Sequence, residues 1–294
     1  MVQQLSAGRR IFIACNYTFL ILLAALCFFP IVHVLAVSFS SSGAATAGLV
    51  TFWPVDFTTS SYEFVLKKPE FLRSFAITLE RVALGTGINM LLTIMLAYPL
   101  SRDSRSFRWR GFYVWIFVIT ILFSGGLVPW YLTIQATGLL DTIWAMIIPG
   151  AVPVFNIILL LNFFRGLPKE LAESAFIDGA GHWTTMWRIY VPLSMPALAT
   201  ILLFAMVGHW NSWFDGLILM NSPDHYPLQS YLQTVVIQRD ISVVSTTDLK
   251  TLTEVSDRTA KSAQIFLGTL PILLVYPFLQ RFFVKGIVLG SVKE

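Results

Sequence analysis

Residues 165–191 combine acidic, small and turn-forming side chains in an order that suits docking to another protein. Pro168 stands where a helix would begin, because the missing N–H of proline costs nothing at the first helical position. Glu170 and Glu173 follow in the first turns, where carboxylates favour the positive end of the helix dipole. Gly179 is well placed to end the helix in a left-handed conformation. The pattern therefore predicts a helix, a glycine turn and a second helix.

The second helix of this hairpin is expected over Trp183–Tyr190, directly before Pro192. In the first helix, Ala172 and Ala175 carry small side chains that would permit a partner to approach closely. Glu173 would supply a charge for a basic partner. The alternative interpretation is an amphipathic hairpin that lies at the membrane surface and only connects two spans. The residue types alone leave both interpretations open.

A second group of residues suits the binding of sugars. It lies near the end of an apolar stretch and comprises Asn211, His209, Trp210 and Trp213. Polar groups within a span are costly unless they face a cavity or a partner helix. Amides donate hydrogen bonds to sugar hydroxyls, and aromatic rings stack on their C–H faces, so the group suits a carbohydrate pathway. However, tryptophans gather at membrane interfaces anyway, and asparagine also bridges helices. Further polar candidates within spans are Asn89, Gln135, Asn156 and Asn162.

Other kinds of chemistry have no support in the sequence. The histidines show no metal-ligand spacing, and no Gly-x-Ser-x-Gly motif for a nucleophilic serine occurs. Both cysteines, Cys15 and Cys27, fall within one apolar stretch. There is no Gly-Lys dipeptide, so the phosphate-binding loop of an ATPase cannot be present. We therefore expect no catalytic residue, no metal site and no bound cofactor, and no basic cluster interleaved with aromatic residues suggests nucleic acid.

The elements that must position these groups are transmembrane helices. The sequence is 56% hydrophobic and only 12% charged, about half the charged share of a soluble domain. Stretches free of Asp, Glu, Lys and Arg reach or approach the roughly 20 residues that cross a bilayer, and backbone inside lipid must form helix. The sequence predicts an all-α, polytopic integral membrane protein forming a single domain over 1–294. Its six predicted spans are near 11–37, 76–98, 112–134, 143–164, 192–214 and 264–284.

The basic residues predict the orientation of these spans. Short loops rich in arginine and lysine alternate along the chain with outer segments of a different kind. The short segment 135–142 has no basic residue, and the long segments 38–75 and 215–261 mix basic with acidic residues. Long loops translocate largely regardless of charge, so this pattern places both termini in the cytoplasm. The hairpin at 165–191 would then be cytoplasmic, and 215–261 would form a long extracellular loop. The residues that carry this assignment are Arg9, Arg10, Arg102, Arg105, Arg108, Arg110, Arg165, Lys169, Arg188, Arg281, Lys285 and Lys293.

The hairpin resembles the cytoplasmic coupling motif of binding-protein-dependent ABC importer permeases. That motif reads Glu-Ala-Ala, three residues, Gly, nine residues and Ile-x-Leu-Pro. This chain has Glu173-Ser174-Ala175, Gly179 and Ile189-Tyr190-Val191-Pro192 at the same spacing. Ser174 and Val191 depart from the pattern conservatively. Ala97–Arg102, Phe123–Pro129, Trp210-Asn211 and Phe283–Gly286 extend the resemblance, which is greatest to the polysaccharide and oligosaccharide permeases common in Gram-positive bacteria.

This resemblance implies a type I ABC importer permease, a multi-pass subunit of the bacterial cell membrane. Such a subunit forms half of a heterodimeric pore with a second, related permease. A separate ABC ATPase dimer, which uses ATP-Mg, receives the coupling hairpin, and an extracellular lipid-anchored or periplasmic solute-binding protein delivers the carbohydrate. The residues that the resemblance assigns to ATPase coupling are Glu170, Ala172, Glu173, Ala175, Asp178, Gly179 and Pro192.

A secondary transporter without an ATPase is the main alternative. It would need charged relay residues within its spans, and only Glu80 and Arg81, near the outer end of the second predicted span, come close. A structural scaffold is a further alternative that no sequence feature excludes by itself. Either would leave the spacing of the coupling motif as an accident.

Overall fold

The computed structural model describes residues 7–103, 107–237 and 256–291, and the side chains of all of these except 236, 237 and 279–291. Within these ranges the chain is helical and contains no strand. Arg105, Lys293 and positions 238–255 of the predicted extracellular loop lie outside the described residues, as do the side chains of Arg281 and Lys285. The chain divides into two compact units, residues 1–69 with 234–270 and residues 70–233 with 271–294.

The first unit contains α1 (Ala7–Ser38), α2 (Ser42–Thr46), α3 (Ser60–Lys67) and the first part of α16 (Asp257–Ser291). The apolar side chains of α1 are mostly exposed, as expected of a helix that faces lipid. Only its end, at Ala36 and Val37, packs into a small cluster with α2. The Arg258 guanidinium donates a hydrogen bond of 2.9 Å to the Ala45 carbonyl, which joins α16 to α2.

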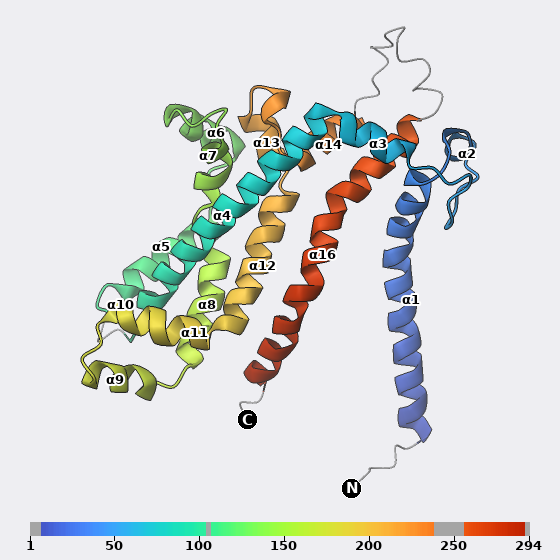
Figure 1. Ribbon diagram of the computed structural model, residues 1–294. Coiled ribbons are helices and arrows are strands. Elements are labelled where there is room, and N and C mark those ends of the chain that lie inside the picture. Colours follow the sequence, from blue (N-terminus) through green and yellow to red (C-terminus); the bar gives the residue numbers. More distant parts are fainter. Residues whose placement is uncertain (1–6, 104–106, 238–255, 292–294) are drawn as a thin grey trace. The chain divides into compact units, whose positions relative to one another are not determined.

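The second unit holds both groups of candidate residues. Its elements are α4 (Pro69–Ser101), α5 (Arg110–Leu122), α6 (Leu127–Ala136), α7 (Ile143–Ile147), the 3₁₀ turn η1 (Ile148–Gly150), α8 (Val154–Gly166), α9 (Glu170–Ile177), α10 (His182–Thr185), the π-helical turn η2 (Met186–Tyr190), α11 (Val191–Leu193), α12 (Met195–Asn211), α13 (Phe214–Leu219) and the 3₁₀ turn η3 (Pro223–His225). The first part of α14 (Leu228–Ile237), up to residue 233, and the last part of α16 also belong to it. In Figure 1 the α9–α11 segment lies at one end of this unit, and α6, α7 and α13 lie at the other.

The core of the second unit joins α4, α8 and α12 to the hairpin. Ile94 and Ala97 of α4, Leu160 of α8 and Ile201 of α12 are all at least 94% buried in one cluster. Ala172 and Tyr190 belong to the same cluster. Because the hairpin shares its buried contacts with three long helices, a displacement of the hairpin is resisted by the packing of those helices.

Three continuous helices in the described part of the chain are long and apolar enough to cross a membrane: α1, α4 and Asp257–Phe278 of α16. Three further pairs of helices pass the same test only together. They are α5 with α6, bent by 118°, residues 143–150 with α8, bent by 45°, and residues 182–193 with α12, bent by 83°. The predicted helical membrane fold is therefore confirmed, and the spans number six if each bent pair crosses once.

The third predicted span, 112–134, is wrong as a continuous helix. Helix α5 ends at Leu122, and α6 begins at Leu127 after a break that contains Gly125 and Gly126. Gly126 adopts a φ of +86°, a conformation that cannot continue a right-handed helix and that glycine adopts without a steric penalty. The charge-free stretch is therefore apolar throughout but not straight.

Several predicted boundaries also differ from the structure. Helix α4 begins at Pro69, seven residues before the predicted 76, because its first turns are polar and still helical. Helix α16 begins at Asp257 instead of 264. Residues 215–261, predicted as a loop, contain α13, η3, α14 and the start of α16. Charge and hydropathy mark where a chain leaves lipid, and they do not mark where its helices end.

Candidate functional site

The glycine turn of the hairpin forms as the sequence predicts. Gly179 has a φ of +80°. Its N–H donates to the Phe176 carbonyl at 3.1 Å, and the Ala180 N–H donates to the Ala175 carbonyl at 2.9 Å. These two bonds make the Schellman motif, which satisfies the last carbonyls of α9 and reverses the chain. The second helical stretch follows over residues 182–193 as predicted, so the helix–glycine turn–helix is confirmed.

The two predicted alanines face inward and the acidic residues face outward. Ala172 is 3% exposed and Ala175 is 7% exposed, and Ala172 packs in the core cluster with Phe164 and Tyr190. The small size of these alanines therefore permits α9 to lie close to its own core. The predicted coupling residues that are exposed are Glu170, Glu173, Asp178, Gly179 and Pro192.

Ile177 adds an apolar group to this acidic surface. Its side chain is 85% exposed, which is unusual for isoleucine, and it lies directly before Asp178. The sequence pattern singled out Ala172 and Ala175 of this helix and not Ile177. The exposure of Ile177 could have been predicted, because an isoleucine outside the apolar face of a short helix does not reach the core.

An ion pair ties the start of the hairpin to the loop after α4. The Lys169 Nζ lies 2.9 Å from the Asp103 carboxylate. This hydrogen bond and the negative charges of Asp103, Glu173 and Glu170 raise the pKa of the Lys169 ammonium. Both partners of the pair are exposed, so its contribution to stability is small. The side chain of Glu173 makes no hydrogen bond or ion pair with any described residue, and its backbone N–H donates to the Lys169 carbonyl at 3.1 Å.

A polar cavity of about 390 Å³ lies at the other end of the second unit. Its polar lining comes from α4, η1, α8, α12 and the start of α13. The polar residues are Arg81, Asn89, Asn156, His209, Ser212 and Asp215. Trp130 and Phe204 contribute aromatic surface to the same cavity. Apolar walls with a few convergent polar groups are typical of ligand sites.

A buried ion pair forms one wall of this cavity. The Arg81 guanidinium, on a residue 2% exposed, donates to both carboxylate oxygens of Asp215, and its Nη1 lies 3.1 Å from Oδ1. Asp215 also accepts hydrogen bonds from the Ser212 hydroxyl at 2.8 Å and the Gly216 N–H at 2.9 Å. Both oxygens of the carboxylate therefore accept hydrogen bonds, which offsets part of the cost of burying the pair, whereas the buried Arg81 Nε has no hydrogen-bond partner among the described residues. The sequence suggested neither the burial of this pair nor its contact.

His209 and Asn89 meet in the same cavity across 120 residues of chain. The His209 Nε2 lies 2.8 Å from the Asn89 Oδ1, and the Asn89 amide donates to the carbonyls of Gly150 and Ala151 at 2.9 and 3.0 Å. Gly85 makes room for the imidazole, because a Cβ at this position would lie 2.5 Å from the His209 ring. The side chains are thus held in fixed orientations by helix α4 and η1.

The remaining sugar-pathway candidates do not line this cavity. Trp210 is 5% exposed and packs edge-on against Phe75, with ring centroids 5.9 Å apart. Trp213 is 40% exposed and meets Phe214 edge-on. Asn211, Gln135 and Asn162 are exposed on the chain's own surface. Of the predicted residues, His209, Asn89 and Asn156 line the cavity together. Arg81, Ser212 and Asp215 line it as well and were not predicted to do so. A role in sugar transport stays a prediction for all six. Among the described residues no group of His, Cys, Asp and Glu is placed to hold a metal ion.

Comparison with known proteins gives matches along nearly the whole chain. Residues 6–288 match the family model described as "Binding-protein-dependent transport system inner membrane component". Protein LplC of Bacillus subtilis is 39% identical over 97% of this chain and 95% of its own length. The polygalacturonan/rhamnogalacturonan transport system permease protein YtcP of the same organism is 36% identical over 97% of this chain and 99% of its own length.

Solved structures also match along nearly the whole chain. A chain of a bacterial ABC transporter involved in the import of the acidic polysaccharide alginate is 32% identical, with a TM-score of 0.88 over 96% of this chain and 100% of that chain. A second alginate transporter structure, in complex with a periplasmic protein that holds an alginate pentasaccharide, matches at 17% identity and a TM-score of 0.55. At that identity the likeness extends to the fold alone.

Proposed function

This chain belongs to the inner-membrane components of binding-protein-dependent transport systems, and on that premise we propose that it forms half of the pore of an ATP-driven importer of oligosaccharides. Its similarity over the whole chain to a subunit of an alginate importer carries the proposal. In it, a second, homologous permease completes the pore, and a solute-binding protein outside the cell delivers the sugar. An ABC ATPase dimer supplies the energy, since no nucleotide-binding loop occurs in this sequence.

The hairpin at 165–191 is the contact with the ATPase in this proposal. Its outward surface combines the free carboxylate of Glu173 with the exposed apolar side chain of Ile177. A basic partner with an apolar recess would complement both. The inner surface of the hairpin shares the core cluster of α4, α8 and α12, so a movement imposed on α9 would be transmitted to the helices that line the polar cavity.

The polar cavity is the part of the pathway that this subunit contributes. Neutral hydrogen-bonding groups, chiefly Asn89, Asn156 and His209, suit sugar hydroxyls, and Trp130 and Phe204 suit the apolar faces of sugar rings. The charges of Arg81 and Asp215 are matched to each other, so the walls present little net charge to a passing oligosaccharide.

Purification of the tagged chain from its host tests the proposal directly. Gently solubilised membranes are expected to yield the chain together with a second permease and an ATPase that has a phosphate-binding loop. Glu173→Lys is expected to weaken or abolish recovery of the ATPase alone, because the reversed charge would face a basic groove. The bound partners are identified by mass spectrometry.

Glu70→Lys is the matched control, since Glu70 is also an exposed carboxylate in the first turn of a helix but lies at the far end of α4. It is expected to leave ATPase recovery unchanged. Recovery of both variants and the wild type without any ATPase, under conditions that preserve other membrane complexes, would contradict the importer. A secondary transporter would then become the leading function.

A further inference from the structure

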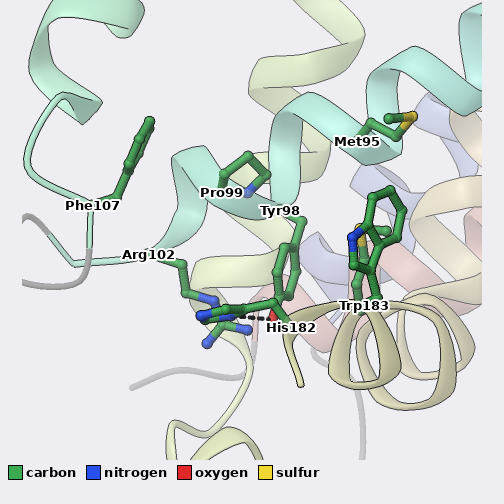
Figure 2. A pocket seen from close by; sticks show the side chains of 8 residues that line it. Met95, Tyr98, Pro99, Arg102, Phe107, His182 and Trp183 are labelled. Atoms are coloured by element: carbon green, nitrogen blue, oxygen red, sulfur yellow. Dashed lines mark hydrogen bonds between the residues drawn. The ribbon is translucent and has the colours of Figure 1, made fainter. Parts of the chain in front are cut away.

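A second cavity lies where the end of α4 meets the returning arm of the hairpin (Figure 2). Its volume is about 310 Å³. Most of its lining is apolar, with Met95 and Pro99 from α4, Phe107 from the following loop, and Trp183 and Met186 from α10 and η2. The polar members are Arg102, His182 and the hydroxyl of Tyr98, and the Tyr98 Oη lies 3.4 Å from the His182 Nδ1. The cavity therefore has an apolar wall and a polar end.

Arg102 provides the charge at that end, and its guanidinium is incompletely bonded. The guanidinium carbon lies 4.4 Å from the centre of the Tyr98 ring and 4.5 Å from that of Tyr190. Its Nε and Nη2 atoms are buried, and neither has a hydrogen-bond partner among the described residues. Aromatic rings stabilise the charge but accept no N–H bond in its plane. Buried donors without an acceptor are costly, so these atoms favour an acceptor from outside the chain.

A basic cavity of about 490 Å³ lies on the other side of the same residue. Of the residues that line either cavity, Arg102 alone lines both. The basic cavity also contains Arg110, Arg165 and Lys169, against the carboxylates of Asp103 and Glu173. Asp103 is already bonded to Lys169. Among the described residues, the guanidinium groups of Arg110 and Arg165 donate only to the neutral carbonyl of Leu100, at 2.9 and 3.4 Å. This cavity therefore has an excess of positive charge.

We propose that these two cavities form a binding site for one anionic phospholipid of the leaflet on the hairpin side. The acyl chain occupies the apolar cavity beside Met95 and Trp183, and the phosphate accepts hydrogen bonds from Arg102. The guanidinium fork matches a phosphate in geometry as well as in charge. Basic pockets beside transmembrane helices bind the headgroups of anionic lipids. A soluble phosphate ester would leave the apolar cavity empty, and a zwitterionic lipid would leave the positive charge unbalanced.

Occupation of this site would make the movement of the hairpin depend on the lipid composition of the membrane. Met95, Tyr98 and Arg102 belong to α4 and its end, whereas His182, Trp183 and Met186 belong to the returning arm of the hairpin. A chain held between them fills space that would otherwise permit the arm to move toward α4. The site does not depend on which sugar the importer carries or on how the hairpin meets the ATPase.

Native mass spectrometry of the full membrane complex tests this site. The complex is delipidated in detergent and titrated with phosphatidylglycerol or with phosphatidylcholine of the same chains. The wild type is expected to retain one phosphatidylglycerol more tightly than the rest, with no equivalent phosphatidylcholine. Arg102→Gln is expected to weaken that binding by about tenfold or more, since the bond to a charged group is lost. Met95→Trp, which keeps Arg102 and fills the apolar cavity, is expected to weaken it as well.

Arg108→Gln is the matched control, because Arg108 is exposed in the same loop, carries the same charge and lines neither cavity. It is expected to bind phosphatidylglycerol as the wild type does. Equal losses in Arg102→Gln and Arg108→Gln would overturn the site, because general attraction of charge would then account for the binding. Competition by glycerol 3-phosphate as strong as that by the intact lipid would also overturn it, in favour of a soluble phosphate ester.

Discussion

The hairpin and the polar cavity each contain a carboxylate, but the two carboxylates differ in their bonding. The Glu173 carboxylate in α9 is exposed and makes no hydrogen bond or ion pair with any described residue, whereas the Asp215 carboxylate in α13 accepts bonds from Arg81, Ser212 and the Gly216 N–H. The free carboxylate is available to a partner, and the bonded one is needed by its own chain. A substitution at the hairpin should therefore change interaction, and a substitution at the cavity should change stability.

The largest effect on stability is expected at the buried ion pair. Arg81→Ala leaves the Asp215 carboxylate without its main partner, which costs about 3–5 kcal/mol when one member of a buried pair is removed. The variant should reach the membrane in smaller amounts and unfold at a lower temperature. Thermal unfolding of the purified complex in detergent measures the loss.

Replacement of both charged residues shows how much of the lost stability comes from an unpaired buried charge and how much from the packing of the cavity wall. Arg81→Met combined with Asp215→Leu removes both charges and retains apolar volume, so most of the lost stability should return. If the double variant were as unstable as Arg81→Ala, an unpaired charge would not be the cause of the lost stability.

Gly85→Ala is expected to have the next largest effect. The added Cβ would lie 2.5 Å from the His209 ring. The imidazole must therefore shift, which strains its bond to Asn89, at a cost of about 1–3 kcal/mol for overpacking. Gly87→Ala, two residues further along the same helix, meets no atom within 4 Å and should be neutral or slightly stabilising. Equal unfolding temperatures for the two variants would show that His209 is not held by this close contact.

Gly179→Ala should cost less, because only the backbone is affected. No atom lies within 4 Å of a Cβ at this position, but the φ of +80° is unfavourable for alanine, by about 1–2 kcal/mol. The cost falls on the turn of the hairpin, so limited proteolysis should cut near residue 179 faster than in the wild type. An unchanged cleavage rate would contradict a turn maintained by the left-handed glycine.

Ile177→Ser should leave stability almost unchanged, within about 0.5 kcal/mol, as for most surface substitutions. The side chain is 85% exposed, so little of its contact with the rest of the chain is lost. Sugar-stimulated ATP hydrolysis by the reconstituted complex should nevertheless fall, if this side chain enters the ATPase. Full activity in this variant would restrict the contact surface to the carboxylates.

The sequence predicts the hairpin well because the determinants of the hairpin are local. Pro168, the acidic first turn and Gly179 lie within a dozen residues, and each acts on the backbone next to it. The left-handed conformation of Gly179 follows from the absence of a Cβ and needs no information about distant parts of the chain. The burial of Ala172 and Ala175 could not be predicted in the same way, because it depends on how α9 packs against residues distant in the sequence.

The cavity could not be predicted from local patterns. Asn89 and His209 are both visible as polar residues within spans, but the bond between them joins residues 120 positions apart. Asp215 falls at the edge of an apolar stretch, where a loop is the simplest interpretation, and only the folded chain brings it to Arg81. Hydropathy likewise indicates how much of a stretch enters lipid but not whether its helix is continuous, as the break at Gly126 illustrates.

That break between α5 and α6 also constrains how the protein can be assembled. Helix α5 has 13 residues and α6 has 10, or about 20 and 15 Å, so neither crosses the hydrocarbon alone. Residues 123–126 are exposed on this chain, and lipid offers no hydrogen bonds to those of their backbone groups that lack a partner within the chain. Biogenesis must therefore supply a protein or water-lined neighbour at this surface. If the proposed second permease covers this surface, a copy of this chain made without it should be short-lived in the cell, because membrane quality-control proteases would degrade it.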